Sequence, residues 1–438
     1  MDEKGPQNSF KITKPFDKQN KLSYANDNMH SYVANVIQIE KTDYEFIEEE
    51  YHQIVETYLS TRQQLQWSLK NKSRELKGLD LIRTNFDYGI ASMKGNEVQF
   101  YISLFKMLNQ YDVDNLIFMI SKMSIITSSR LTNFFYFLDE ETEFSSFIAK
   151  YVLTKYAEVE ASKKVIEALL NKALPTRHLL ELIKEDLNRI INNNQGNMRM
   201  SRQLAIYQQL ITAMDRVINN HKIKLLEPEL KLSFDWNKVK WAFDLWMTEQ
   251  GFPDKNIEYT LFLDEGIPSN IFTELNINKI EEDCDSRDYV GLQITDMIVV
   301  LVGKLVSQIT SNTRYDFNKP EQRVLLDEKY FDLNQQQYNL IVELNKFLLD
   351  KETNYHFVND AYFDETLAFQ IYIGYVASFD DFEQYHKVTL NEHVEYYFHN
   401  IIKFASMKYE EGIANILHAK SLYGSLKKSI EIGQSRPL

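Results

Sequence analysis

The sequence predicts an α/β fold, in which a mixed sheet flanked by helices carries a long helical insertion and is followed by an all-α C-terminal region. Residues 31–39 alternate and are rich in β-branched side chains, which is typical of a strand. Residues 116–126 form an apolar run that is typical of a buried central strand. Residues 257–263 form a third strand that leads into Asp264, and helical patterns separate the three strands.

The length and composition indicate a globular protein with two or three domains. The chain has 438 residues, of which 44% are hydrophobic and 26% are charged, which is enough to bury a real core. Its net charge of −14 argues against broad, non-specific binding to nucleic acid, although a local basic groove remains compatible with it.

Cysteine content and hydropathy predict a cytoplasmic protein. Cys284 is the single cysteine, which excludes an internal disulfide framework and a cysteine-cluster zinc site. Residues 1–20 lack the apolar core of a signal peptide. The longest apolar run, at 297–302, is far shorter than the roughly 18 residues of a membrane span. We therefore expect no membrane association.

The first two predicted segments are a flexible lead-in and the first part of the α/β domain. Residues 1–20 are polar and contain Gly5, Pro6 and Pro15, so they are expected to be loose. Residues 21–128 form the first part of the domain. Its predicted elements are strands at 22–25, 31–39 and 116–126 and helices at 45–69 and 98–109.

The remaining chain is predicted to alternate between helical and α/β segments. Residues 129–234 form the helical insertion, which the polar sequence at 192–197 divides into two amphipathic pieces. Residues 235–315 form the second part of the α/β domain and begin with a helix that contains three tryptophans. Residues 316–438 are helical and rich in Tyr and Phe, and we expect them to form a separate C-terminal region.

The segment 291–303 reads as a buried helix that contains one charge, Asp296. It is apolar nearly all round, and Leu292 and Val300 share a face with Asp296. Burying an unpartnered carboxylate costs several kcal/mol, so Asp296 should be paired, hydrogen-bonded or bound to a metal. Asp264 at a strand end and Glu75 in a polar segment are candidates to share a magnesium or manganese site with it, because these ions prefer carboxylate oxygens.

Several motifs resemble the RNase H-like family catalogued as domain of unknown function 3800. The matching segments are Asp264-Glu265, Asp285-Ser286, Gly291-Leu-Gln-Ile-Thr-Asp296 and Arg74-Glu-Leu-Lys-Gly78, in the order and setting of that family. The family opens with Asp-Glu-Ser-Gly at the end of its first strand. Here the matching place is assigned to Tyr24-Ala-Asn-Asp-Asn28, where Asn26 stands at the position of the first Asp. Thr295 replaces the usual Ala.

The resemblance implies an RNase H-like sheet and a metal-dependent nuclease that acts on RNA or DNA, with a role in bacterial defence or mobile-element biology. It implies that Asp27, Glu75, Asp264 and Asp296 bind Mg or Mn and carry catalysis. Because Asn26 departs from the family pattern, the alternative is a catalytically silent RNase H-like scaffold. Such a scaffold would bind a protein or nucleic-acid partner, or a second copy of the chain, through its helical regions.

Basic residues near these motifs are candidates for nucleic-acid contacts. Residues 61–106 contain eight Lys or Arg against four Asp or Glu, and a second basic cluster lies in the insertion. The candidates are Lys72, Arg74, Lys77, Arg199 and Arg202. Solvated helix faces would give the same pattern. In the same way, Asp264 fits a turn, Glu75 fits a charged loop and Asp296 fits an ion pair within the core. HExxH, P-loop and GxGxxG motifs are absent from the sequence.

Overall fold

The computed structural model shows a mostly helical protein, with 69% helix and 9% strand. It describes residues 1–4, 12–14, 23–24, 31–72, 74–82, 86–141, 145–197, 200–220, 230–249, 258–275, 277–313, 326–350, 357–359, 364–424 and 428. The predicted RNase H-like mixed sheet is wrong. Helices supply most of the core, and the described strands are divided among three sheets.

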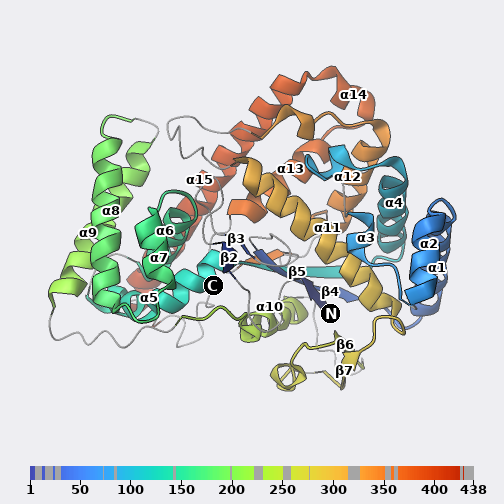
Figure 1. Cartoon of the computed structure of the whole chain (residues 1–438), viewed down its shortest axis with the longest axis horizontal. Coiled ribbons are helices and arrows are strands. Elements are labelled where there is room, and N and C mark those ends of the chain that lie inside the picture. Colours follow the sequence, from blue (N-terminus) through green and yellow to red (C-terminus); the bar gives the residue numbers. More distant parts are fainter. Residues whose placement is uncertain are drawn as a thin grey trace.

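The largest sheet has four strands in the order β1-β4-β5-β8, and its two long strands, β4 and β5, are labelled in Figure 1. β4 (Ser31–Gln38) pairs antiparallel with both β1 (Asp2–Lys4) and β5 (Asp114–Ser121), and β8 (Phe357–Asn359) pairs parallel with β5. The strands predicted at 31–39 and 116–126 are thus present, although the second ends at Ser121, where α5 (Lys122–Glu141) begins.

The strand that ends at Asp264 lies outside this sheet. β6 (Thr260–Asp264) pairs parallel with β7 (Lys279–Cys284), and β2 (Ile12–Lys14) pairs with β3 (Ser23–Tyr24) in another two-stranded sheet. Residues 2–4 of the predicted lead-in belong to the main sheet as β1. Met1 also donates from its nitrogen to the carbonyl of Phe262 and accepts from the amide of Asp264, which holds β6 beside β1.

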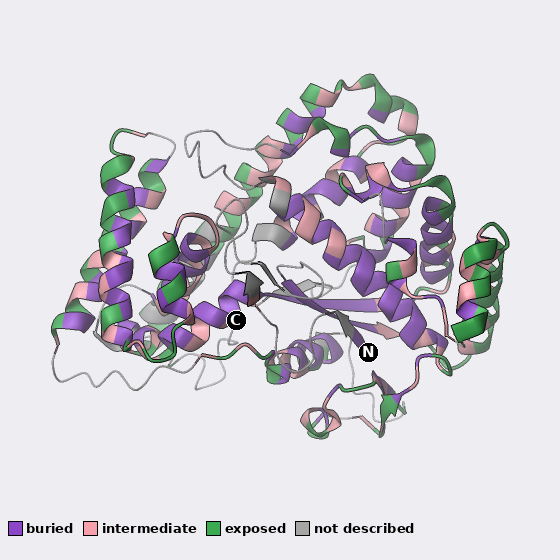
Figure 2. Ribbon diagram, in the orientation of Figure 1, coloured by how far each residue is buried: buried purple, intermediate pink, exposed green. Residues whose placement is uncertain are grey.

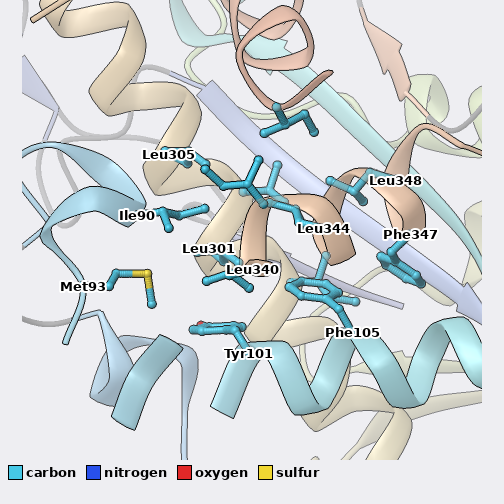
Figure 3. Close-up of a cluster of buried hydrophobic side chains, with 14 of the residues drawn as sticks. Ile90, Met93, Tyr101, Phe105, Leu301, Leu305, Leu340, Leu344, Phe347 and Leu348 are labelled. Atoms are coloured by element: carbon cyan, nitrogen blue, oxygen red, sulfur yellow. The ribbon is translucent and has the colours of Figure 1, made fainter. Parts of the chain in front are cut away.

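One face of the main sheet is covered by helices from both halves of the chain. α11 (Val290–Thr313) packs against β1 and β4, and α4 (Gly95–Gln110), α12 (Gln335–Leu348) and α13 (Asp364–Ala377) complete the layer. Figure 3 shows Leu301 and Leu305 of α11 among side chains of α4 and α12. The expected separation of residues 316–438 is therefore wrong, since α12 and α13 share the core of the α/β part and β8 pairs with β5.

The opposite face of the main sheet is covered by α10 (Trp236–Glu249). Its Trp236 and Trp246 are buried with Tyr32 and Phe118 of the sheet in a second hydrophobic cluster. The alternation of β4 explains both layers, because Val33 contacts the α11 side while Tyr32, Ala34 and Val36 contact the α10 side.

The region predicted as a helical insertion at 129–234 consists, where it is described, of helices that share their own hydrophobic core, and this group begins earlier, with α5 at Lys122. Besides α5, these helices are α6 (Ser146–Val159), α7 (Lys163–Leu170), α8 (Thr176–Asn193) and α9 (Ser201–Asn219). The break predicted at 192–197 falls between α8 and α9. Figure 2 shows that each helix buries one stripe and exposes another, as amphipathic helices do.

Four further helices in the described part of the chain extend the structure. The predicted helix at 45–69 is two helices, α1 (Tyr44–Ser60) and α2 (Gln63–Lys72), separated at Thr61 and Arg62. At the C-terminal side, α14 (Phe382–Lys387) precedes the long α15 (Leu390–Tyr423), which runs toward the insertion in Figure 1. An ion pair at 3.4 Å between Arg202 and Glu410 links α15 to α9.

α11 is the one described helix that is long and apolar enough to span a membrane. Its window Val290–Thr310 is, however, 78% buried inside the protein. This burial is what a core helix requires, and it agrees with the helix that the sequence predicts at 291–303.

His393 in α15 makes the stability of the C-terminal core depend on pH. Its ring is buried and stacks on Tyr385 at 4.2 Å, and its nitrogens contact the Tyr375 hydroxyl and the Tyr385 carbonyl. Burial lowers the pKa of His393 from 6.5 to about 4. The fold thus favours the neutral ring. Its contribution is complete above pH 6.5 and is lost as the pH falls toward 4.

We expect the free energy of unfolding to fall by about 2 kcal/mol more in the wild type than in His393→Phe between pH 7.5 and pH 4.5. Urea denaturation at both pH values measures this difference. The carboxylates that titrate in this range are common to both proteins, so their contributions cancel in the difference. An equal fall in both proteins would show that His393 does not carry the pH dependence.

Candidate functional site

The candidate site begins with the short segment between α2 and α3 (Gly78–Leu81). Asp80 fixes the shape of this segment. It accepts two hydrogen bonds from the Arg74 guanidinium, at 2.7 and 2.9 Å, and one from the Lys77 amide at 3.1 Å. Arg74, predicted to contact nucleic acid, is therefore occupied by a bidentate ion pair within the segment.

Gly78 brings this segment directly onto α11. A Cβ atom at Gly78 would lie 2.8 Å from Val300 Cβ and 3.0 Å from the Asp296 carbonyl oxygen, so only glycine allows the approach. The Gly78 amide donates a 2.7 Å hydrogen bond to Asp296 Oδ2. The buried carboxylate of Asp296 thus faces a helix start, where a backbone N–H satisfies one of its oxygens.

Glu75, Lys77 and Ser286 form a closed polar triangle beside Asp296. Lys77 Nζ lies 2.6 Å from Glu75 Oε1 and donates to Ser286 Oγ at 2.9 Å, while Ser286 Oγ donates to Glu75 Oε1 at 2.8 Å. The side chain of Gln293 holds this turn by donating to the Ser286 carbonyl at 2.8 Å. The triangle therefore joins the 74–80 segment to the start of α11.

The electrostatics of the triangle favour charged side chains. Burial opposes ionisation of Glu75, but the hydrogen bonds from Lys77 and Ser286 outweigh it and lower the pKa of the carboxyl. Burial also opposes the charge on Lys77. The carboxylates of Glu75, Asp296 and Asp2 outweigh that effect and raise the pKa of the ammonium. Three carboxylates from different parts of the chain therefore act on one ammonium group.

Asp2 is a site residue that the sequence reasoning did not select. Met1 and Leu263 both lie in the core under α10, so the next residues along these adjacent strands, Asp2 and Asp264, point toward the α11 face. Asp2 is only 6% exposed and its charge acts on Lys77. A signal was present in the sequence, because Asp2-Glu-Lys-Gly5 matches the expected Asp-Glu-Ser-Gly at three of four positions.

The first-strand position predicted at Asn26 and Asp27 is a different place in the chain. Both residues lie outside the described part of the structure. The strand before them, β3, pairs with β2 rather than with the main sheet, whereas β1 pairs with β4. The strand expected at 22–25 is therefore present as β3 but does not join the main sheet, whereas Asp2 is the carboxylate that strand pairing brings to α11.

The predicted nucleic-acid contacts are scattered among different environments. Lys77 belongs to the triangle and Arg74 to its supporting segment. Arg202 pairs with Glu410 in another part of the molecule, and Arg199 lies outside the described residues. Lys72 is exposed at the end of α2. Of the described candidates, only Lys77 thus touches the carboxylates, and Arg202 lies elsewhere.

The Tyr51 hydroxyl is an unsatisfied polar group near these carboxylates. Tyr51 is fully buried, and burial, Asp296 and Glu75 all raise its pKa. In the described part of the protein its hydroxyl oxygen has no hydrogen-bond partner. Buried hydroxyls normally have one, so a water molecule or a small polar ligand would fit here.

The donor chemistry of the site fits a hard divalent cation, because the candidate ligands are all carboxylates. Within the described ranges, however, no three His, Cys, Asp or Glu side chains are close enough to hold one ion as they stand. The Lys77 ammonium lies against Glu75. Glu75 can join an ion only after Lys77 turns away, a rotamer change open to a side chain that is 36% exposed.

No family model, curated protein or solved structure matches this chain. The resemblance to domain of unknown function 3800 therefore depends on the motif residues alone. Of these, Glu75, Ser286 and Asp296 are joined through the Lys77 triangle and the Gly78 segment, and Asp264 lies beside Asp2.

Proposed function

We propose that this chain is a divalent-metal-dependent phosphodiesterase that acts on nucleic acid in the cytoplasm. The observation that carries the proposal is the convergence of carboxylates on Lys77. The negative charges of Glu75, Asp296 and Asp2 all raise the pKa of its ammonium group. Strand pairing directs Asp264 to the same face as Asp2. The order of the motif residues, which resembles domain of unknown function 3800, supports the same activity.

Each residue has a role in this proposal. Asp2, Asp264 and Asp296 would hold magnesium or manganese once their side chains turn toward one ion, and Glu75 would join them once Lys77 releases it. A bound ion supplies Lewis-acid stabilisation of phosphodiester oxygens and lowers the pKa of a water molecule. Lys77, freed from Glu75, would place its ammonium beside the negatively charged phosphate. Ser286 orients Glu75, and the Gly78 amide fixes one oxygen of Asp296.

The second candidate function is a catalytically silent scaffold that binds a partner protein, nucleic acid or a second copy of the chain. The Lys77–Glu75 ion pair favours it, because an ammonium already neutralises a carboxylate that an ion would need. In a scaffold this pair would be permanent, and the site would join the 74–80 segment to α11 without binding a metal.

Manganese binding distinguishes the two functions. We expect calorimetric titration of the full chain to show manganese binding, and we expect cleavage of RNA or DNA oligonucleotides that EDTA abolishes. Asp2→Asn removes one charge from the proposed ligand set. It should weaken manganese binding and slow cleavage, each by roughly a hundredfold. Asp264→Ala should act in the same direction.

Asp244→Asn, an exposed position on α10, serves as the control and should leave both measurements unchanged. Absence of manganese binding and of cleavage by the wild-type chain would contradict the nuclease proposal and favour the scaffold. Manganese-dependent cleavage that survives in both Asp2→Asn and Asp264→Ala would contradict the proposed ligand set.

A further inference from the structure

α2 carries the most exposed of the large hydrophobic side chains that the structure describes. Trp67 is 70% exposed, although Leu69 on the same short helix is buried and Leu65 packs against the main core. The helix is therefore anchored by its leucines and presents an indole ring to solvent. Figure 2 shows the outer side of α1 and α2, at the right edge of the molecule, as largely exposed. An exposed indole ring on an anchored helix is available to stack on a flat ring of a partner.

The neighbours of Trp67 on α2 are polar, and one of them, Lys70, is positively charged. Gln63, Gln64, Lys70 and Asn71 stand three or four residues away, on the same side of the helix, and all four are exposed. α2 contains two lysines and no acidic residue, in a chain with a net charge of −14. The surface therefore combines a stacking ring, hydrogen-bonding amides and a local positive charge, which together match a polyanion with flat, polar bases.

α2 also lies close to the carboxylate site along the chain. Lys72 is five positions after Trp67 in the helix, and Glu75 is three positions after Lys72. The rise is about 1.5 Å per helical residue and at most about 3.5 Å per extended residue. The backbone atoms of Trp67 and Glu75 therefore lie within about 18 Å of each other. A stacked strand carries one phosphate per about 3.4 Å, so about five nucleotides span this distance.

We propose that α2 is a stacking platform that binds single-stranded nucleic acid and leads it to the carboxylate site. Trp67 stacks on an unpaired base, Lys70 contacts a phosphate, and the amides of Gln63, Gln64 and Asn71 contact base edges or sugars. A duplex does not fit this platform, because its bases are already stacked on one another. The placement at a reactive site rests on the proposed function, whereas binding by α2 does not.

Binding measured without divalent metal tests the platform separately from catalysis. The probe is a fluorescent 12-nucleotide strand, as DNA and as RNA, whose anisotropy is followed in EDTA with the full-length chain. We expect Trp67→Ala to weaken binding about tenfold or more and Trp67→Phe to weaken it less, because stacking follows the aromatic ring. Lys70→Gln should weaken binding and reduce the slope of log K against log salt by about 0.7. Trp67→Ala should leave that slope unchanged.

Two control variants match the changes in residue type. Tyr136→Ala removes an exposed aromatic ring from α5, and Lys106→Gln removes an exposed lysine from α4. Both should bind as the wild type does, and unlabelled duplex should not compete. Wild-type binding that is absent, or that is equal in Trp67→Ala, would overturn the platform even if the protein cleaves nucleic acid. Trp67-dependent binding without any cleavage would support the platform and contradict the nuclease instead.

Discussion

Asp296→Asn is expected to abolish nuclease activity while leaving the fold intact. The Gly78 amide donates to one carboxylate oxygen of Asp296, and an asparagine carbonyl can accept the same hydrogen bond. The variant therefore removes the charge without leaving a buried N–H unsatisfied. If the carboxylates bind a divalent ion, losing this charge should lower manganese affinity and cleavage by about a hundredfold or more. The melting temperature should stay within a few degrees of the wild type.

The comparison with Asp296→Ala separates charge from structure. Alanine also removes the acceptor of the Gly78 amide, so we expect an additional loss of about 1–3 kcal/mol in the free energy of unfolding. Asp288→Asn, an exposed change in the loop before α11, is the matched control and should alter neither activity nor stability. Full manganese-dependent activity in a folded Asp296→Asn protein would contradict a catalytic role and leave Asp296 as a structural acceptor.

The sequence predicted the local elements better than their assembly. Alternation and apolar runs located β4, β5 and α11, because each element buries a face whose period appears in a short window. Assembly depends on long-range hydrogen bonds that a short window does not contain. The three-residue β1 is an example, since it joins β4 more than 25 residues later and β6 about 260 residues later. For this reason the polar segment 1–20 was predicted to be flexible, although it contains β1.

The same limit explains the outcome at the site. Asp296 and Glu75 could be predicted, because a single charge in an apolar helix and a Glu-Leu-Lys motif are local signals. Lys77 could be named but its role could not, since its contact with Ser286 crosses 209 residues of chain. Asp2 was missed because β1 is too short to show a strand pattern. The exposure of Trp67 could not be predicted from a single helix at 45–69, because the break between α1 and α2 lies within that range.

Asp186→Ala is expected to lower the free energy of unfolding of the helical insertion more than any substitution on its surface. Asp186 is 7% exposed and accepts hydrogen bonds from the Tyr156 hydroxyl at 2.6 Å and from the Ser162 amide at 2.9 Å. It also pairs with Arg189 at 2.9 Å. Alanine would leave the buried Tyr156 hydroxyl and the partly buried Ser162 amide without an acceptor, so we expect a loss of about 3–5 kcal/mol. Native-state hydrogen exchange of peptides from α6–α9 localises this loss.

Asp215→Ala is the matched control, because it breaks an ion pair of similar length in the same group of helices. Lys184 lies 2.6 Å from Asp215, but the Asp215 side chain is 42% exposed. Water can replace that partner, so the expected loss is at most about 1 kcal/mol. Since the insertion has its own hydrophobic core, the exchange increase in Asp186→Ala should be confined to α5–α9 and leave α11 and α12 protected. Equal losses in the two variants, or a loss that spreads to α11, would contradict burial as the cause and the insertion as a separate cooperative unit.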